Sequence, residues 1–198
     1  MAWTVLNSGP YMDMLNTALG PYIDDDGTYV FDTPLSPNGA MPMIILEDLG
    51  RYAAWIIQNP VKSNGLTFGA STQHVHWPEL VKTFTEVTGK PARYLQVPAS
   101  EWVEKHFTHL PNGASTRFGT AANKDDPSVW TWGQNFINWF NLYEISGWNV
   151  GLIKRDYKFL DEILPERTKS VGEWMRKTGY TGEPKQVLGG GRGAHYKA

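Results

Sequence analysis

The sequence has 198 residues, enough for one domain or for one domain with a small lobe. Its 41% hydrophobic and 19% charged residues are typical of a packed globular protein and exclude a disordered chain. The net charge of -2 gives no sign of a nucleic acid or an anionic membrane as partner. The absence of cysteine excludes disulfides, thiolate catalysis and cysteine-ligated zinc.

Short apolar runs broken by turns dominate the N-terminal part of the chain. Strands are predicted at residues 3–7, 28–31, 43–46, 66–70 and 93–97. The first is expected to be buried and to stop at Gly9 and Pro10. Asp48 is the expected N-cap of an amphipathic helix that ends at Asn59 and Pro60.

Helical patterns dominate the C-terminal part. Helices are predicted over residues 78–88, 101–108, 133–145 and 155–164, and from residue 171 to the residue before Gly179. Gly89 is the expected C-cap of the first of these helices, and Ser100 the expected N-cap of the second. The polar segment 111–129 predicts a long loop of the kind that often forms a lid. The glycine-rich residues 188–193 predict a flexible tail.

Several segments, taken in order, resemble the NmrA-like family, an atypical branch of the short-chain dehydrogenase/reductase superfamily. They are residues 3–12, 41–53, 86–94, 154–157 and 170–180, and their sequences are most similar to those of fungal members. The resemblance implies an α/β fold, with the remnant of a Rossmann-like parallel sheet and a mainly helical substrate-side lobe. It implies a sheet-associated part at 1–77, lobe helices at 78–182 and a flexible tail at 183–198.

The family also implies an NAD(P) cofactor, whose pyrophosphate needs a glycine-rich turn between a strand and a helix. The sequence has no such turn, because its only glycine cluster, residues 189–193, opens no predicted helix. We therefore expect the chain to correspond to the C-terminal portion of the family fold, without the dinucleotide-binding half.

Candidate binding residues follow from the same map. The resemblance puts Asn7, Ser8, Gly9 and Pro10 at the cofactor, and Tyr11 and Met14 on the substrate side, although Gly9 and Pro10 are also typical of a simple turn. Trp130 and Trp132, beside the loop 111–129, are candidates for an aromatic pocket that would take an apolar small molecule.

Two histidine pairs are candidate metal ligands. His74 and His76 would point to one side of a strand, and His106 and His109 would lie one helical turn apart. Neither pair has an acidic third ligand in register, so the sequence favours no metal site.

Three hypotheses for function remain. The first is a truncated NmrA-like protein that acts as a small-molecule-binding or protein-interaction module without its own redox centre. The second is part of an NAD(P)-dependent oxidoreductase whose N-terminal half is missing. The third is a cofactor-independent isomerase or cyclase. An incomplete sheet would leave an apolar face and an edge uncovered, which predicts a homo-oligomer or a protein partner. The lack of cysteine and of an apolar leader favours a cytoplasmic location.

Overall fold

The structure is a computed structural model that describes residues 2–119, 126–151 and 153–185. Its strands are β1 Val5–Asn7, β2 Tyr22–Ile23, β3 Tyr29–Thr33, β4 Met41–Met43, β5 Thr67–Gly69, β6 Gln73–Val75 and β7 Ala92–Gln96. Its α-helices are α1 Leu46–Gln58, α2 Pro60–Ser63, α3 Trp77–Thr88, α4 Ala99–His106, α5 Trp132–Glu144, α6 Tyr157–Ile163 and α7 Val171–Thr178. Short 3-10 turns lie at Met12–Asn16, Gly113–Ser115 and Gly147–Asn149.

The strands form three small sheets. β1 pairs in parallel with β5, β3 pairs in parallel with β7 and antiparallel with β2, and β4 pairs antiparallel with β6. An isolated parallel bridge between Tyr11 and Ile44 joins the segment after β1 to the segment after β4. The predicted mixed α/β class with parallel strands and helices is therefore confirmed.

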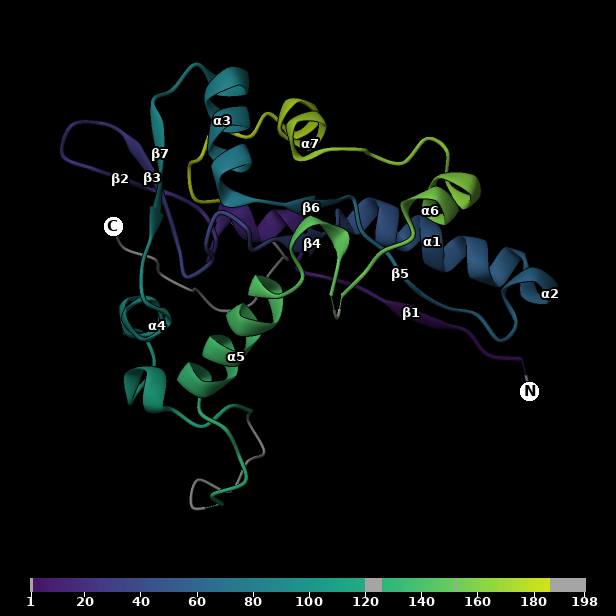
Figure 1. The fold of residues 1–198 in the computed structure, drawn as a ribbon, viewed down its shortest axis with the longest axis horizontal. Helices are drawn as coiled ribbons and strands as arrows, with labels where there is room; N and C mark the ends of the chain where they lie inside the picture. The colour runs from purple at the N-terminus through teal and green to yellow at the C-terminus, as the bar shows by residue number, and fades with distance from the viewer. Residues whose placement is uncertain (1, 120–125, 152, 186–198) are drawn as a thin grey trace.

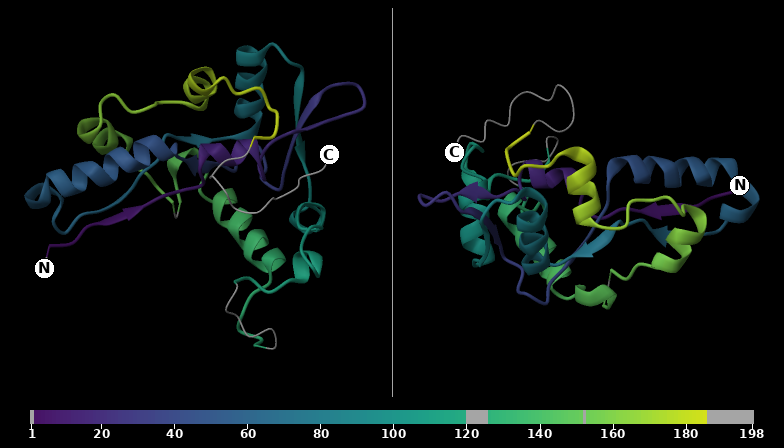
Figure 2. Two further views of the ribbon diagram at one scale, coloured as in Figure 1. Left: turned by 180° about the vertical axis from the view of Figure 1, so that it is seen from behind. Right: turned by 90° about the horizontal axis from the view of Figure 1, so that it is seen from above.

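The elements are arranged in two arms that meet near β4 and β6 (Figure 1). One arm holds β1, β5, α1, α2 and α6, and both views in Figure 2 show α1 alongside the β1–β5 pair. The other arm holds β3 and β7 with α3 and α7, which pack on each other, and the packed pair α4 and α5 extends from it.

Each arm has its own group of buried side chains. The larger group is rich in aromatic rings, and its fully buried members include Trp77, Trp102, Phe31 and Phe84. The smaller group lies under the β1–β5 pair and consists of Ile44, Tyr52, Ala70, Leu160 and Leu164. Burial of these rings and aliphatic chains is the main favourable term for the fold.

Several predicted helix ends are confirmed. Gly89 ends α3 and Gly179 follows α7, both with positive φ as a C-terminal glycine requires. α5 begins one residue earlier than predicted because Thr131 and Gln134 form a reciprocal capping box at its start.

Two predicted N-caps are wrong. α1 begins at Leu46, so Asp48 lies within its first turn, where its Oδ2 accepts the Thr168 N–H at 2.9 Å. α4 begins at Ala99 after Pro98, so Ser100 is already inside the helix. In α1 a contact with a residue distant in the chain decides the role of Asp48, and in α4 the helix begins directly after a proline. A local capping pattern predicts neither effect.

The prediction of a buried first strand is also wrong. Val5 is 42% exposed, and Asn7 is exposed as well. Among the described strands β1 pairs only with β5, so its other edge has no backbone partner there.

The predicted loop 111–129 contains ordered turns where the structure describes it. A 3-10 turn lies at Gly113–Ser115, and Arg117 forms a bridge with Thr131. Residues 120–125 of this loop and the predicted tail at 188–193 lie outside the described residues.

Candidate ligand-binding site

A cavity of about 470 Å³ opens where the carboxyl ends of β1 and β5 meet the segment before α6. It is lined by Asn7, Leu66, Thr67, Phe68, Gly69, Lys154, Arg155, Asp156 and Phe159. In open α/β sheets this end of parallel strands is where ligands bind. The cavity is therefore the candidate site.

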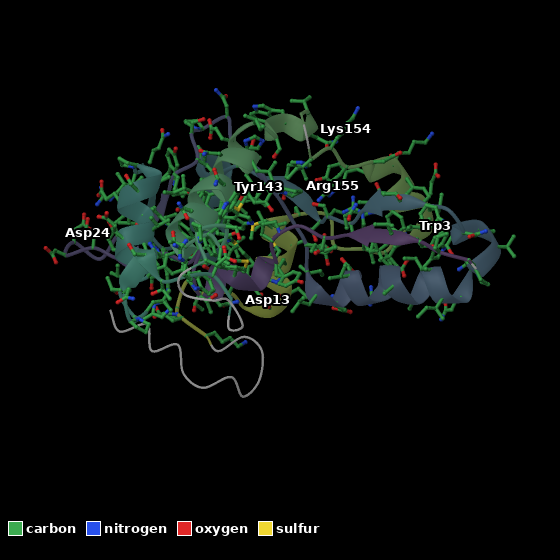
Figure 3. All side chains as sticks on the ribbon, turned by 90° about the horizontal axis from the view of Figure 1, so that it is seen from below. Trp3, Asp13, Asp24, Tyr143, Lys154 and Arg155 are labelled. Carbon is green, nitrogen blue, oxygen red and sulfur yellow. The ribbon has the colours of Figure 1, made fainter. Side chains whose placement is uncertain are left out.

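Strand register brings Asn7 and Arg155 to this cavity. Asn7, the last residue of β1, pairs with Gly69, the last residue of β5. The Arg155 side chain passes so close to Gly69 that a Cβ there would lie 2.7 Å from its guanidinium carbon. Glycine at this position is thus what allows the guanidinium to rest at the strand ends. In the view of Figure 3, Arg155 lies between Tyr143 of α5 and Trp3 at the outer end of the β1 segment.

The backbone of Arg155 is held by the side chain of Asn149. Asn149 Nδ2 donates to the Arg155 carbonyl at 2.8 Å, and the Arg155 N–H donates to Asn149 Oδ1 at 2.7 Å. Asn149 and its neighbour Trp148 both adopt left-handed backbone conformations, with φ of 59° and 53°. Asparagine tolerates this conformation, but tryptophan at positive φ is strained. Strain at Trp148 is therefore stored next to the residue that positions Arg155.

The guanidinium of Arg155 is buried with little compensation. The residue is 7% exposed, its Nε has no hydrogen-bond partner, and Nη1 donates to the Lys154 carbonyl at 3.3 Å. Burial lowers the pKa of Arg155, and the nearby Tyr157 and Tyr143 oppose that shift. Arginine keeps its charge in proteins, so the cavity has a positively charged wall.

Aromatic rings form another wall. Phe68 of β5 and Phe159 of α6 contact edge-to-face, with ring centroids 5.3 Å apart. Tyr52 and Trp55 of α1 pack behind them. These rings join α1, β5 and α6, and they give the cavity an apolar side.

A neutral hydrogen-bonded cluster lies next to the cavity. The Tyr157 hydroxyl donates to His74 Nδ1 at 2.6 Å, since His74 Nε2 faces the Ile153 carbonyl at 3.2 Å and must carry the proton there. The Ser71 hydroxyl lies 3.3 Å from that of Tyr157. Burial lowers the pKa of His74 to about 4 and raises the pKa of Tyr157. The cluster therefore ties the Arg155 segment to β6 without a charge.

The four residues predicted at the cofactor have different environments. Asn7 lines the cavity, and Ser8 beside it is exposed. Gly9 packs on β4, where a Cβ would lie 1.9 Å from the Pro42 carbonyl oxygen. Pro10 is buried, and its carbonyl accepts the Ile44 N–H.

The four residues predicted on the substrate side do not line this cavity. Tyr11 packs against the smaller core group and Met14 against the larger one. Trp132 packs on Phe118, with ring centroids 4.5 Å apart, while Trp130 is 53% exposed. The structure thus brings Asn7 to the cavity but leaves the two tryptophans at the far end of α5.

Sequence reasoning missed Arg155 as a site residue. Asp156 caps α6, accepting the Phe159 N–H at 3.0 Å. The segment 154–157 was among those that carry the family resemblance, and this was the one available signal.

A bound NAD(P) does not fit two of the strand–helix turns that the structure describes. The turn between β4 and α1 puts Glu47 and Asp48 in the first helical turn, where they would repel a pyrophosphate. The turn between β6 and α3 has Trp77 and Pro78 in place of glycine.

No group of three or more potential metal ligands occurs in the described part of the chain. No helix in that part is long and apolar enough to cross a membrane.

Comparison with known proteins gives a family and a fold. The model of the NmrA-like family matches residues 2–127. No curated protein matches the sequence at a significant level.

Similar solved structures include NmrA, a negative transcriptional regulator. Its complex with NAD is 17% identical with a TM-score of 0.58, and its complex with NADP is 16% identical with a TM-score of 0.56. A nucleoside-diphosphate-sugar epimerase from Staphylococcus aureus is 15% identical with a TM-score of 0.59. Each comparison covers 89% of this chain and 52% of the other. The similarity is therefore one of fold, and the chain spans about half the length of these structures.

Proposed function

Because the chain belongs to the NmrA-like family, we propose that it acts as a small-molecule-binding module of that family without a redox centre of its own. The observation that carries the proposal is the meeting of Asn7 and the buried Arg155 in one cavity at the carboxyl ends of β1 and β5.

The chemistry of the cavity supports this proposal. Its volume falls in the range of small-molecule sites, and it combines aromatic walls with a few polar groups, the usual composition of such sites. The close fit between Gly69 and Arg155 and the hold of Asn149 on the Arg155 backbone keep the polar groups in place before a ligand arrives.

A second proposal follows from the ligands of the similar structures. NmrA has been solved with NAD and with NADP, and it is about twice as long as this chain. Under this alternative the chain supplies the substrate side of an NAD(P)-dependent oxidoreductase, and a dinucleotide-binding half comes from elsewhere.

Titration of the 15N-labelled chain separates the two proposals. A mixture of small aromatic and apolar compounds should shift the backbone amide signals of Asn7 and Gly69, while NADPH and NADP⁺ at millimolar concentration should leave them unchanged. The amide of Gly27, in a turn of the other arm, serves as the internal control. Binding of NADPH at micromolar concentration would favour the oxidoreductase proposal. The absence of any shift of the Asn7 signal would contradict the proposal of a binding module.

We also propose a partner for the free edge of β1, namely a second copy of the chain. Val5 and Trp3 are 42% and 55% exposed beside this edge, and an exposed edge with apolar side chains favours pairing. A fungal, cytoplasmic protein is proposed from the wording of the family segments and from the lack of cysteine.

A further inference from the structure

We infer that the cavity binds a small organic acid, with the carboxylate on the guanidinium of Arg155 and the apolar body against Phe68 and Phe159. The inference rests on the proposed binding function and names the class of ligand.

The charge of Arg155 lacks the compensation that the fold gives to Arg167. Both residues are buried, at 7% and 5% exposure. Arg167 Nε donates to Asp161 at 2.8 Å, and its Nη1 donates to the carbonyls of Thr72 and Thr168 at 2.9 and 3.2 Å. Its charge is therefore paired with a carboxylate, and its hydrogen bonds join separate segments of the chain.

Arg155 shows the opposite pattern. Its Nε is buried with no partner, and its Nη1 has only the Lys154 carbonyl at 3.3 Å. A buried charge without a counter-charge is costly, and an anion that accepts from the two terminal nitrogens of the guanidinium would relieve that cost. A carboxylate has the planar two-oxygen geometry that matches this fork.

The site is built in advance of the ligand. Asn149 holds the Arg155 backbone through two hydrogen bonds, and Gly69 leaves room for the guanidinium at the end of β5. Asn7 lines the same cavity from the neighbouring strand end.

The other walls narrow the class of anion. Phe68 and Phe159 offer an apolar surface, which inorganic phosphate cannot use. Lys154 is exposed at the rim, and Asp156, also in the lining, keeps its carboxylate on the start of α6. The buried charge of Arg155 and the rim charge of Lys154 stand beside one rim carboxylate, and this small positive excess favours a monoanion with an apolar body over a polyphosphate.

The test uses phenylacetate as the probe, with neutral phenylacetamide and inorganic phosphate as comparisons. Calorimetry and amide shifts at Asn7 and Gly69 should give binding of phenylacetate about tenfold or more tighter than that of phenylacetamide, because the charged hydrogen bonds are lost in the amide. Phosphate should bind more weakly than phenylacetate, because it has no apolar body to place on the two rings.

Variants locate the effect at the guanidinium. Arg155→Met should weaken phenylacetate by about tenfold or more, and Arg155→Lys should weaken it by less, because lysine keeps the charge but not the fork. Gly69→Ala should also weaken it, since the new methyl displaces the guanidinium. Arg176→Met removes one exposed charge from α7 and should leave phenylacetate binding unchanged.

The outcomes are separable. Equal binding of phenylacetate and phenylacetamide to the unaltered chain would overturn the inferred acid while leaving the binding module intact, and so would binding of phosphate as tight as that of phenylacetate. If none of the probes or compounds shifts the Asn7 amide signal, both the inferred acid and the binding module are overturned. The comparison of ligands on the unaltered chain decides the question even if Arg155→Met fails to fold.

Discussion

His74 and Tyr157 share a buried hydrogen bond in which neither side chain is charged at neutral pH. Burial keeps the pKa of His74 at about 4 and raises that of Tyr157, so the proton stays on the tyrosine hydroxyl. Such a pair fixes the segment that carries Arg155 and avoids the cost of a further buried charge.

Protonation of His74 should make stability depend on pH. The pKa of His74 is lower in the folded chain, about 4, than its ordinary 6.5, so the unfolded chain binds the proton first as the pH falls. The contribution of neutral His74 to the free energy of unfolding is fully present above pH 6.5. It is lost as the pH falls from 6.5 to about 4, by roughly 3 kcal/mol in all. Urea unfolding across this range measures the loss. His74→Gln, which cannot titrate, should show a clearly smaller loss, with the remainder from groups such as His106, whose pKa burial also lowers.

Removal of the Tyr157 hydroxyl tests the same bond from the other side. Tyr157→Phe leaves His74 Nδ1 buried without a donor and should reduce the free energy of unfolding by about 1–3 kcal/mol. Denaturant unfolding at pH 7 is the measurement. Tyr22→Phe, at a partly exposed tyrosine of β2, is the matched control and should change stability little. Equal effects of the two substitutions would contradict the role given to the Tyr157 hydroxyl.

At the scale of elements, α6 depends on its cap. Asp156 accepts the Phe159 N–H at the start of this seven-residue helix, which also carries Phe159 into the cavity. Asp156→Ala should cost about 1 kcal/mol of unfolding free energy, while Asp156→Ser, which keeps a capping oxygen, should cost much less. Thermal unfolding of both variants checks this. A serine variant as unstable as the alanine variant would point to the charge of Asp156 instead of its cap.

The sequence predicted the elements whose signals are local. The apolar face and the terminal Gly89 predict α3, and α7 begins at Val171 and ends before Gly179 as expected. β6 was not predicted, since Gln73–Val75 has no alternating pattern and is stabilised by pairing with β4. Arg155 was missed for a related reason, because its burial depends on Gly69 and Asn149, which are distant from it or lie in a turn that no propensity predicts.

At the scale of the whole molecule, β1 has a strand partner on one edge only among the described strands, and two of its three residues are exposed. We predict that the chain sediments as a dimer or larger species at tens of micromolar, with the free edge of β1 in the contact. Val5→Lys, which puts a charge beside this edge, should shift the population towards monomer in analytical ultracentrifugation. Val61→Lys, at the 90% exposed position in α2, is the control. A strictly monomeric unaltered chain would contradict the prediction.

The parallel pairing of β3 with β7 has a consequence for how the chain folds. Tyr29 to Thr33 must find Ala92 to Gln96, and the Tyr180 hydroxyl donates to the carbonyl of Leu15 from the far end of the chain. Contacts this distant in sequence are slow to form, because long loops must close before any of the contacts stabilises them. During synthesis on the ribosome, β3 therefore cannot pair with β7 until β7 has been made. The larger core cannot be completed until Tyr180, one of its buried members, has been synthesised.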